Sequence, residues 1–248
     1  MQPPLLIGIS GPSSSGKTTL SRLLRDIFPP SKLFLLHLDD FYLTDAEIPV
    51  TKDGVQDWDC IGSLNLPQLK QALQHMKESG RSPDWLVSQE DQNSVGEHGV
   101  PDVEVQRLRG EVRKLLDGRH GWDGRRICIV DGFLLFSEEM KDVRELFDVR
   151  LFLRTSYETA KRRREARSGY VTLEGFWQDP PGYVDKIVWP NYVKDHSFLF
   201  KDGHVDGELD EGVCKSVGIH GMPREAEVNM TKCLRWAFGV LERAIEGS

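Results

Sequence analysis

A glycine-rich loop between a strand and a helix is the feature that most constrains this chain. Residues 11–19 read Gly-Pro-Ser-Ser-Ser-Gly-Lys-Thr-Thr, which matches the pattern G-x-x-x-x-G-K-[ST]. The apolar run 5–9 precedes the loop, and a helical pattern begins near Lys17. In this order the backbone N–H groups of the loop surround phosphate oxygens, and the helix N-terminus adds partial positive charge. The sequence therefore predicts a nucleoside-triphosphate site, against the alternative of a Gly/Ser turn that matches by chance.

The side chains of this loop have distinct expected tasks. Lys17 reaches the terminal phosphates of the nucleotide, and the hydroxyl of Thr18 can ligate Mg²⁺. Glycine allows the tight turn that brings the backbone close to the phosphates. The loop residues that we expect to bind the nucleotide are Gly11, Ser13, Ser14, Ser15, Gly16, Lys17, Thr18 and Thr19.

Strand-like and helical patterns alternate along the rest of the chain, and this alternation predicts the fold class. It is typical of an α/β protein with a parallel, doubly wound sheet of about five strands flanked by helices, of the P-loop NTPase type. Ser156 is the expected N-cap of one helix, and Pro29-Pro30 ends another. Strand-like runs lie at residues 5–10, 33–38, 127–130, 149–153 and 196–200, and helical patterns at residues 17–27, 66–76, 103–116 and 225–245.

The 248 residues, of which 39% are hydrophobic, are enough for one sizeable domain over residues 1–248. The polar segment at about residues 81–124 is expected to be an insertion, and we assign it no chemistry. Residues 169–182 are rich in glycine, proline and aromatic side chains, which suits a mobile cover. We therefore expect a lid over about residues 163–182.

Composition excludes several classes of partner. The net charge of −7 argues against nucleic acid, and no apolar run approaches the roughly 20 residues of a membrane span. The four cysteines are far apart and form no C-x-x-C pair, so we expect neither a zinc site nor a disulfide framework. We expect a cytoplasmic protein, without excluding access to the nucleus, and the sequence leaves its oligomeric partner open.

Carboxylates follow two of the predicted strands. Asp39 and Asp40 come directly after the second run, where open α/β sheets bind ligands. One of them can accept the proton of an attacking hydroxyl, which suits phosphoryl transfer to an alcohol. Asp131 ends the run 127–130 and predicts a magnesium or substrate role. The alternatives are an Asp pair that caps a turn and an isolated carboxylate at a strand end.

A basic helix precedes the expected lid. Arg163 and Arg167 are one turn apart, so one face can present both guanidinium groups to a single polyphosphate. A cover that carries arginines neutralises charge on the transferred phosphoryl group and excludes water. The alternatives are a solvated helix that pairs with Glu158 and Glu165 and a basic localisation tract.

An aromatic residue and an acid adjoin each other before the helical run 66–76. Trp58 can stack on a flat base, and Asp59 can accept hydrogen bonds from sugar hydroxyls. Core packing of the tryptophan is the alternative.

Taken together, these motifs resemble the nicotinamide riboside kinases, members of the uridine-kinase-like group of phosphate-loop kinases. The resemblance covers most of the chain outside residues 81–124 and the segment after about residue 203. Its motifs are the loop with the Gly-Ile-Ser before it, Leu-Asp-Asp-Phe-Tyr at 38–42, Asp-Gly-Phe-Leu-Leu-Phe at 131–136, Lys-Arg-Arg-Arg at 161–164, and Pro-Gly-Tyr-Val-Asp-Lys-Ile-Val-Trp-Pro at 181–190.

The resemblance implies an activity. The γ-phosphoryl group of ATP would pass to the 5′-hydroxyl of nicotinamide riboside, giving nicotinamide mononucleotide for NAD biosynthesis, with ATP and Mg²⁺ as cofactors. Nicotinic acid riboside would be a second substrate. An aromatic face and nearby carboxylates suit a cationic nicotinamide ring better than a neutral uracil.

The resemblance also implies roles for individual residues. Asp39 would act as the base and touch the metal, Trp58 and Asp59 would grip the riboside, and Asp131 stands where the family more often has glutamate. Trp58 stands where tyrosine is more familiar. The implied catalytic residues are Asp39, Lys17 and Arg163; the metal ligands are Thr18, Asp39 and Asp131; the nucleotide contacts of the lid are Arg163, Arg167 and Gly169; and the substrate contacts are Asp39, Asp40, Phe41, Tyr42, Trp58, Asp59, Asp131 and Arg164.

Other hypotheses share part of this evidence. A uridine-cytidine kinase, or a pantothenate or phosphoribulose kinase, would have the same loop and lid with a different acceptor pocket. A nucleotide-dependent switch or binding module would need the phosphate site alone. The chain lacks the Asn-Lys-x-Asp pattern that reads guanine, which argues against a GTPase.

Overall fold

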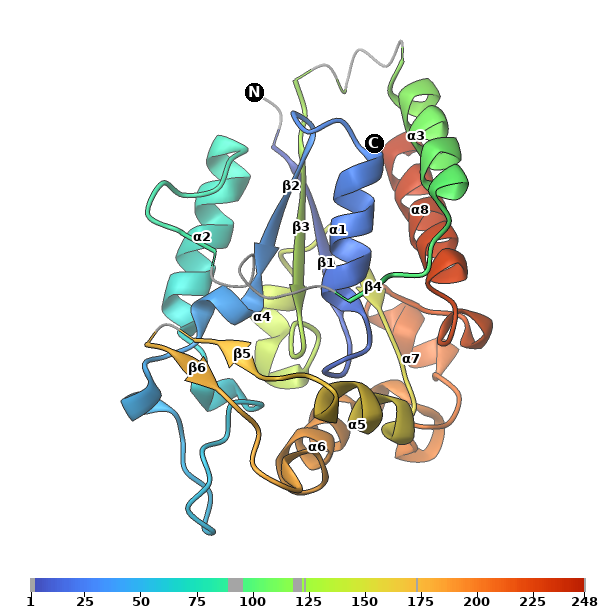
Figure 1. The fold of residues 1–248 in the computed structure, drawn as a ribbon. Coiled ribbons are helices and arrows are strands. Elements are labelled where there is room, and N and C mark those ends of the chain that lie inside the picture. Colours follow the sequence, from blue (N-terminus) through green and yellow to red (C-terminus); the bar gives the residue numbers. More distant parts are fainter. Residues whose placement is uncertain (1–2, 89–95, 118–121, 123, 173, 248) are drawn as a thin grey trace.

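A parallel sheet of five strands, in the order β2-β3-β1-β4-β7, lies at the centre of this computed structural model (Figure 1). The structure describes residues 3–88, 96–117, 122, 124–172 and 174–247. Strand β1 lies between β3 and β4 and pairs with both in parallel register. The strands are β1 Leu5–Ser10, β2 Leu33–His37, β3 Ile127–Gly132, β4 Val149–Phe152 and β7 Ile219–Gly221.

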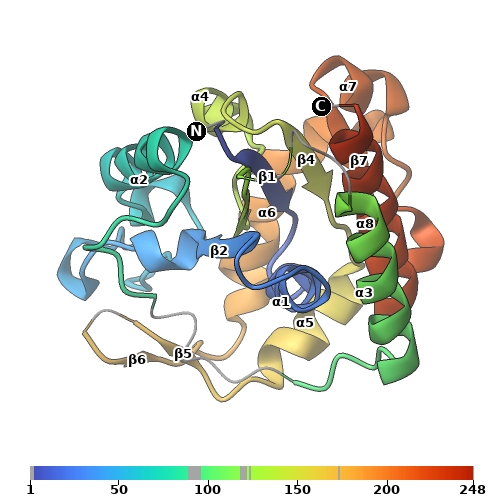
Figure 2. The same cartoon turned by 90° about the horizontal axis from the view of Figure 1, so that it is seen from above.

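Helices cover both faces of this sheet (Figure 2). Successive side chains of a strand point to opposite faces, so Ile7 and Ile9 enter one apolar core and Leu6 enters the other. The first core is closed by α1 Lys17–Ile27, α3 Asp102–Leu116 and α8 Met230–Glu246, and the second by α2 Leu66–Ser79, α4 Lys141–Arg144, α6 Trp189–His196 and α7 Glu211–Ser216.

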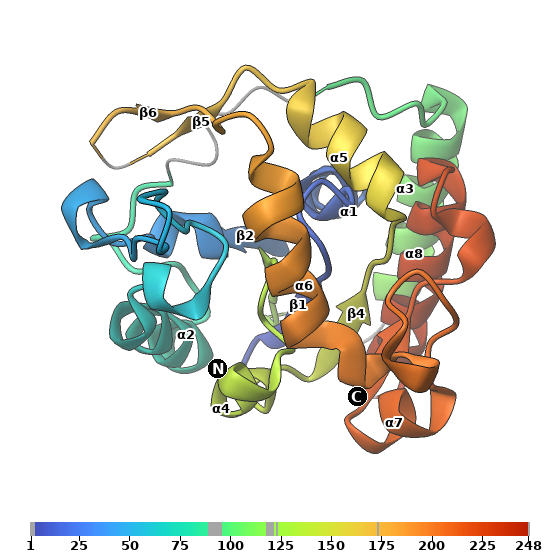
Figure 3. The ribbon, with the colours of Figure 1, turned by 90° about the horizontal axis from the view of Figure 1, so that it is seen from below.

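The remaining elements lie where the strands end. Helix α5 Tyr157–Glu165 and a small antiparallel hairpin of β5 Tyr170–Val171 and β6 Phe176–Trp177 lie beyond the carboxyl ends of the parallel strands (Figures 1 and 3). Ser156 caps α5, because its hydroxyl accepts a hydrogen bond from the Thr159 backbone N–H, as the sequence predicts. A π-helical turn, Val184–Val188, leads from this region into α6.

The predicted fold class and four of the five predicted strands are confirmed. The strand predicted at residues 196–200 is wrong: His196 ends α6, and Ser197–Leu199 form a 3₁₀ turn. Leu199 and Phe200 are buried because they pack against the face of the sheet, which explains why the run is apolar. The fifth strand is Ile219–Gly221, which is too short to show a pattern.

The last helix begins later than its pattern indicates. Its N-cap is Asn229, whose side chain accepts a hydrogen bond from the Lys232 backbone N–H. Val228, expected on the apolar side of this helix, is 81% exposed and precedes the cap. The predicted start at residue 225 is therefore wrong, because the asparagine cap fixes the first turn.

The segment 81–124, predicted as an insertion, contains α3, which packs in the first of the two cores. Val105, Leu108 and Val112 of α3 are buried in the cluster that includes α1 and α8. Within the described part of the chain, no helix has the length and apolar character needed to cross a bilayer. All four cysteines are free thiols.

Candidate active site

The phosphate loop joins β1, the middle strand, to α1. Gly11 has a φ of 147°, and a Cβ atom there would lie 2.3 Å from the carbonyl oxygen of Leu153, so only glycine fits. Gly16 occupies the N-cap of α1 in a left-handed conformation and supplies no capping side chain. The first turn of α1 also contains no acidic residue. The N-terminus of α1 thus presents its backbone donors to an anion.

Lys17 lines the cleft, and its ammonium group is buried there. Its Nζ donates a hydrogen bond to the carbonyl oxygen of Pro12 at 2.8 Å. Burial lowers the pKa of Lys17 to about 8, although the nearby carboxylates of Asp39 and Asp131 raise it. The ammonium group is therefore placed between the loop and two acids that come from neighbouring strands.

One cleft brings together the ends of three strands. Asp39 lies in the 3₁₀ turn Leu38–Phe41 that follows β2, and Asp131 is the fifth residue of β3. The cleft encloses about 900 Å³, counted out to its open mouth. Among its lining residues are Ser13, Ser14, Gly16, Lys17, Thr18, Thr19, Asp39, Tyr42, Trp58, Asp59, Asp131, Phe133, Arg164, Arg167, Tyr170 and Trp177.

Asp131 is buried and only half satisfied by the protein. Its Oδ1 lies 3.0 Å from Nδ1 of His37, its register partner in β2. Its Oδ2 is buried and has no hydrogen-bond partner among the described residues. A buried carboxylate oxygen without a partner is costly unless a ligand or water satisfies it.

The residues at this point fit a magnesium ion. In the described part of the chain no three His, Cys, Asp or Glu side chains cluster as a closed metal site. Mg²⁺ does not need one, because it keeps several waters and takes one or two protein oxygens together with substrate phosphates. Thr18, Asp39 and Asp131 supply oxygens of this kind on the wall of one cleft.

Three arginines from α5 and the residues after it, Arg163, Arg164 and Arg167, lie close to the phosphate loop. Arg163 Nη1 donates to the carbonyl oxygen of Ser14 at 3.2 Å. Arg163 and Arg167 line a groove on the outer side of the loop, together with Ser15 and Gly169. This groove and the cleft share the loop residues, so the two arginines are within reach of a ligand bound to it.

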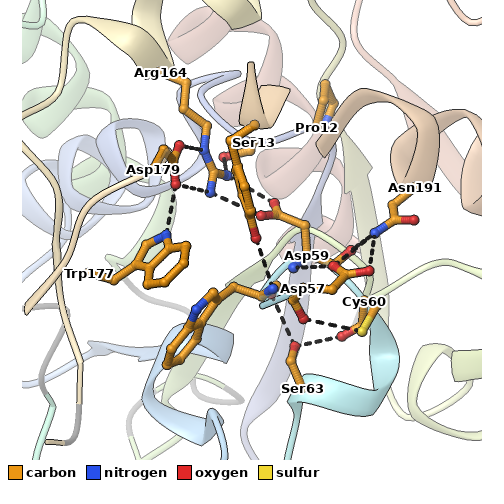
Figure 4. Close-up of polar contacts among 12 residues, drawn as sticks. Pro12, Ser13, Asp57, Asp59, Cys60, Ser63, Arg164, Trp177, Asp179 and Asn191 are labelled. Carbon is orange, nitrogen blue, oxygen red and sulfur yellow. Dashed lines mark hydrogen bonds and ion pairs between the residues drawn. The ribbon is translucent and has the colours of Figure 1, made fainter. Parts of the chain in front are cut away.

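Arg164 lines the cleft itself, and its guanidinium points toward Asp59 and Asp179 (Figure 4). Its guanidinium forms a two-point ion pair with Asp59, with both N–O distances at 2.9 Å, and it also contacts Asp179 and the hydroxyl of Ser13. Asp59 and Arg164 are both buried. The acid expected to bind a sugar is thus held by an arginine from α5.

Aromatic rings form the other wall of the cleft. Trp58 is 4% exposed, and its ring lies 5.4 Å from that of Tyr42 and 5.6 Å from that of Trp177. The Phe133 ring stacks on Tyr42 at 6.3 Å. Sequence reasoning missed Trp177 as a site residue, although the aromatic content of the predicted lid was a signal for it. The wall suits a flat, cationic ring.

Six of the predicted residues do not line the cleft. Three of them, Ser15, Arg163 and Gly169, line the groove on the outer side of the loop, and the other three line neither. Phe41 is fully buried in the core beneath the 3₁₀ turn, and Asp40 is buried without lining the cleft. Gly11 packs on the backbone of Leu153. In the 3₁₀ turn Leu38–Phe41 and the residue after it, Asp39 and Tyr42 line the cleft, whereas Asp40 and Phe41 are directed away from it.

A phosphate loop in one cleft with carboxylates, arginines and aromatic rings is the arrangement of a phosphate-loop kinase, because phosphoryl transfer consists mainly of positioning and charge neutralisation. The order of the parallel strands agrees with this class.

Comparison with known proteins narrows the class. A nicotinamide riboside kinase of Schizosaccharomyces pombe is 44% identical to this chain over 206 residues, or 83% of this chain and 84% of that protein. The nicotinamide riboside kinase of Saccharomyces cerevisiae is 34% identical over 94% of this chain and 93% of its own. Human nicotinamide riboside kinase 1 is 32% identical over 76% of this chain and 75% of its own. The chain belongs to the nicotinamide riboside kinase family.

Comparisons with family models and with solved structures do not narrow the class further. No protein-family model matches the chain. The solved structure of a possible uridine kinase from Bacillus stearothermophilus aligns with 85% of this chain and 90% of its own, at 14% identity and a TM-score of 0.45. The fold assignment rests on the strand order and not on this likeness.

Proposed function

We propose that this protein transfers the γ-phosphoryl group of ATP to the 5′-hydroxyl of nicotinamide riboside, which gives nicotinamide mononucleotide and feeds NAD biosynthesis. Nicotinic acid riboside is the proposed second substrate. The observation that carries the proposal is a single cleft that is lined by the phosphate loop, by Asp39 and by a group of aromatic and acidic side chains.

At the phosphate end, the loop binds the polyphosphate. The backbone N–H groups at the start of α1 and the ammonium group of Lys17 contact the β- and γ-phosphates. Arg163 and Arg167 approach from the lid side and neutralise the charge that develops on the transferred group. Thr18, Asp39 and Asp131 would hold Mg²⁺, directly or through water. When bound, this ion offsets the charge of the β- and γ-phosphate oxygens.

At the acceptor end, the riboside binds through its ring and its sugar. Trp58 and Trp177 pack on each other and form one aromatic wall, and the cationic nicotinamide ring binds against its electron-rich face. Asp59 accepts hydrogen bonds from the ribose hydroxyls. Both of its oxygens already accept from Arg164, but a carboxylate has about four lone-pair sites, so the sugar can use the rest.

Transfer then requires one proton and one phosphoryl group to move. Asp39 accepts the proton of the 5′-hydroxyl while the 5′-oxygen forms a bond to the γ-phosphorus. The bond from this phosphorus to the bridging oxygen breaks, and ADP leaves with the electron pair. The lid excludes water, which would otherwise accept the phosphoryl group.

An assay of the purified protein with ATP, Mg²⁺ and a panel of ribosides tests this proposal. We expect turnover of nicotinamide riboside and nicotinic acid riboside, with uridine and cytidine as much poorer acceptors. Good turnover of uridine without turnover of nicotinamide riboside would replace the assignment with a uridine-cytidine kinase. ATP binding without turnover of any acceptor would favour a nucleotide-dependent switch.

A further inference from the structure

The guanidinium of Arg164 joins three separate segments of the chain, at Ser13, Asp59 and Asp179 (Figure 4). Nη1 donates to Ser13 Oγ of the phosphate loop at 2.8 Å, and Nη1 and Nη2 donate to Asp59. Nε and Nη2 donate to Asp179 at 2.6 and 3.2 Å. The side chains of Arg164 and Asp59 are each 6% exposed and that of Asp179 is 17% exposed, so this cluster is largely shielded from water.

Asp179 has a second partner on the lid. Its Oδ1 accepts a hydrogen bond from Nε1 of Trp177 at 2.9 Å, in addition to the contact from Arg164 (Figure 4). Trp177 packs on Trp58 and forms the aromatic wall of the cleft together with it. One carboxylate therefore connects the ring wall of the acceptor pocket to the ion cluster that holds Asp59.

We propose that Asp179 is a positioning residue of the acceptor pocket, which fixes the indole of Trp177 and the guanidinium of Arg164 and, through Arg164, the carboxylate of Asp59. The inference rests on the function proposed above and deepens it. Asp179 does not itself line the cleft, so it acts through these neighbours.

The physical reason lies in what each partner loses without this carboxylate. The Nε1–H of Trp177 and the Nε–H of Arg164 each have Asp179 as an acceptor, and a buried donor without an acceptor is costly. The two carboxylates of Asp59 and Asp179 also outweigh the single guanidinium of Arg164. This excess negative charge beside an aromatic wall favours a cationic ring over a neutral base.

The variant Asp179→Asn tests the proposal, because it keeps the volume and one acceptor oxygen but removes the charge. We expect the KM and the calorimetric dissociation constant for nicotinamide riboside to rise ten- to hundredfold, while the KM for ATP stays unchanged and the variant stays folded. The matched control is Glu165→Gln on the neighbouring helix position, where the carboxylate is 52% exposed and lies 3.8 Å from Lys161. It should match the wild type.

A second variant separates the two partners of Asp179. Trp177→Phe keeps a ring face but lacks the N–H donor, so adding Asp179→Asn to it should raise the riboside KM less than in the wild-type background. Full additivity would overturn the link to Trp177. A wild-type riboside KM in Asp179→Asn, or equal rises for riboside and ATP, would overturn the positioning role. If instead the wild-type enzyme neither binds nor phosphorylates nicotinamide riboside, the proposed function fails.

Discussion

At the scale of single residues, Asp39 carries the largest predicted catalytic effect. It is the half-buried acid that faces Lys17 across the cleft, and its carboxylate is the proposed acceptor of the 5′-hydroxyl proton. We expect Asp39→Ala to lower kcat by about 10²-fold or more, the usual contribution of a general base. Its effect on ATP binding should be small, because Lys17 and the loop amides remain. Steady-state kinetics and nucleotide titration measure the two effects.

The control for this prediction is Asp53→Ala, which removes an exposed carboxylate outside the cleft. It should keep wild-type kcat. Unchanged turnover in Asp39→Ala would remove that residue from the role of base, whereas equal losses of turnover and of ATP affinity would assign it to the nucleotide site alone.

Residues differ in how far the sequence could place them. Asp39 follows β2 and Asp131 lies near the end of β3, and these two strands pair in parallel register, so a motif at a strand end predicts a position in the cleft. Phe41 belongs to the same motif, but the 3₁₀ turn directs its side chain into the core. The contacts of Trp177 and Asp179 could not be predicted, because they depend on how the lid folds back and no spacing links them to residues 58 and 59.

At the scale of elements, the strands show why pattern reading succeeds in the centre of a sheet and fails at its edge. The middle strand β1 is buried along its whole length and reads as a continuous apolar run. The edge strand β7 has only three residues, and His220 within it is exposed. The apolar run at 196–200 imitates a strand because it packs against the sheet from α6 and the turn after it.

The lid hairpin gives a prediction at this scale. Gly169 has a φ of 142°, and a Cβ atom there would lie 2.4 Å from the Trp177 carbonyl oxygen and from the Phe176 ring. Gly169→Ala should therefore displace β6 and with it the Trp177 wall of the cleft. We expect kcat/KM for the riboside to fall at least tenfold, with little change in melting temperature, because the hairpin lies outside the two cores.

The same hairpin supplies a matched control. Gly175 precedes β6, and a Cβ atom at that position would meet nothing within 4 Å. Gly175→Ala should keep wild-type kinetics, which separates the geometric effect from the general effect of stiffening a glycine. If both variants behave alike, the hairpin geometry does not determine acceptor binding.

At the scale of the whole molecule, a histidine buried in one of the two cores makes the free energy of unfolding depend on pH. His196 is the last residue of α6 and is fully buried, with its ring in contact with those of Phe152 and Tyr192. Its Nδ1 lies within hydrogen-bond distance of the Tyr192 carbonyl oxygen. Burial lowers the pKa of His196 to about 4, so the folded protein keeps this ring neutral at pH values where the unfolded chain protonates it.

This difference has a definite sign. Above the unfolded value of about 6.5 the ring is neutral in both states and has no effect on the free energy of unfolding. As the pH falls from 6.5 toward 4, the unfolded chain takes up the proton first, so stability decreases by about 3 kcal/mol over this window and then levels off. Denaturant unfolding between pH 7 and pH 4 measures this slope. His196→Gln should show a shallower slope whatever its absolute stability, and the exposed His204→Gln should keep the wild-type slope. A wild-type slope in His196→Gln would mean that carboxylates, not this buried imidazole, govern the loss of stability in acid.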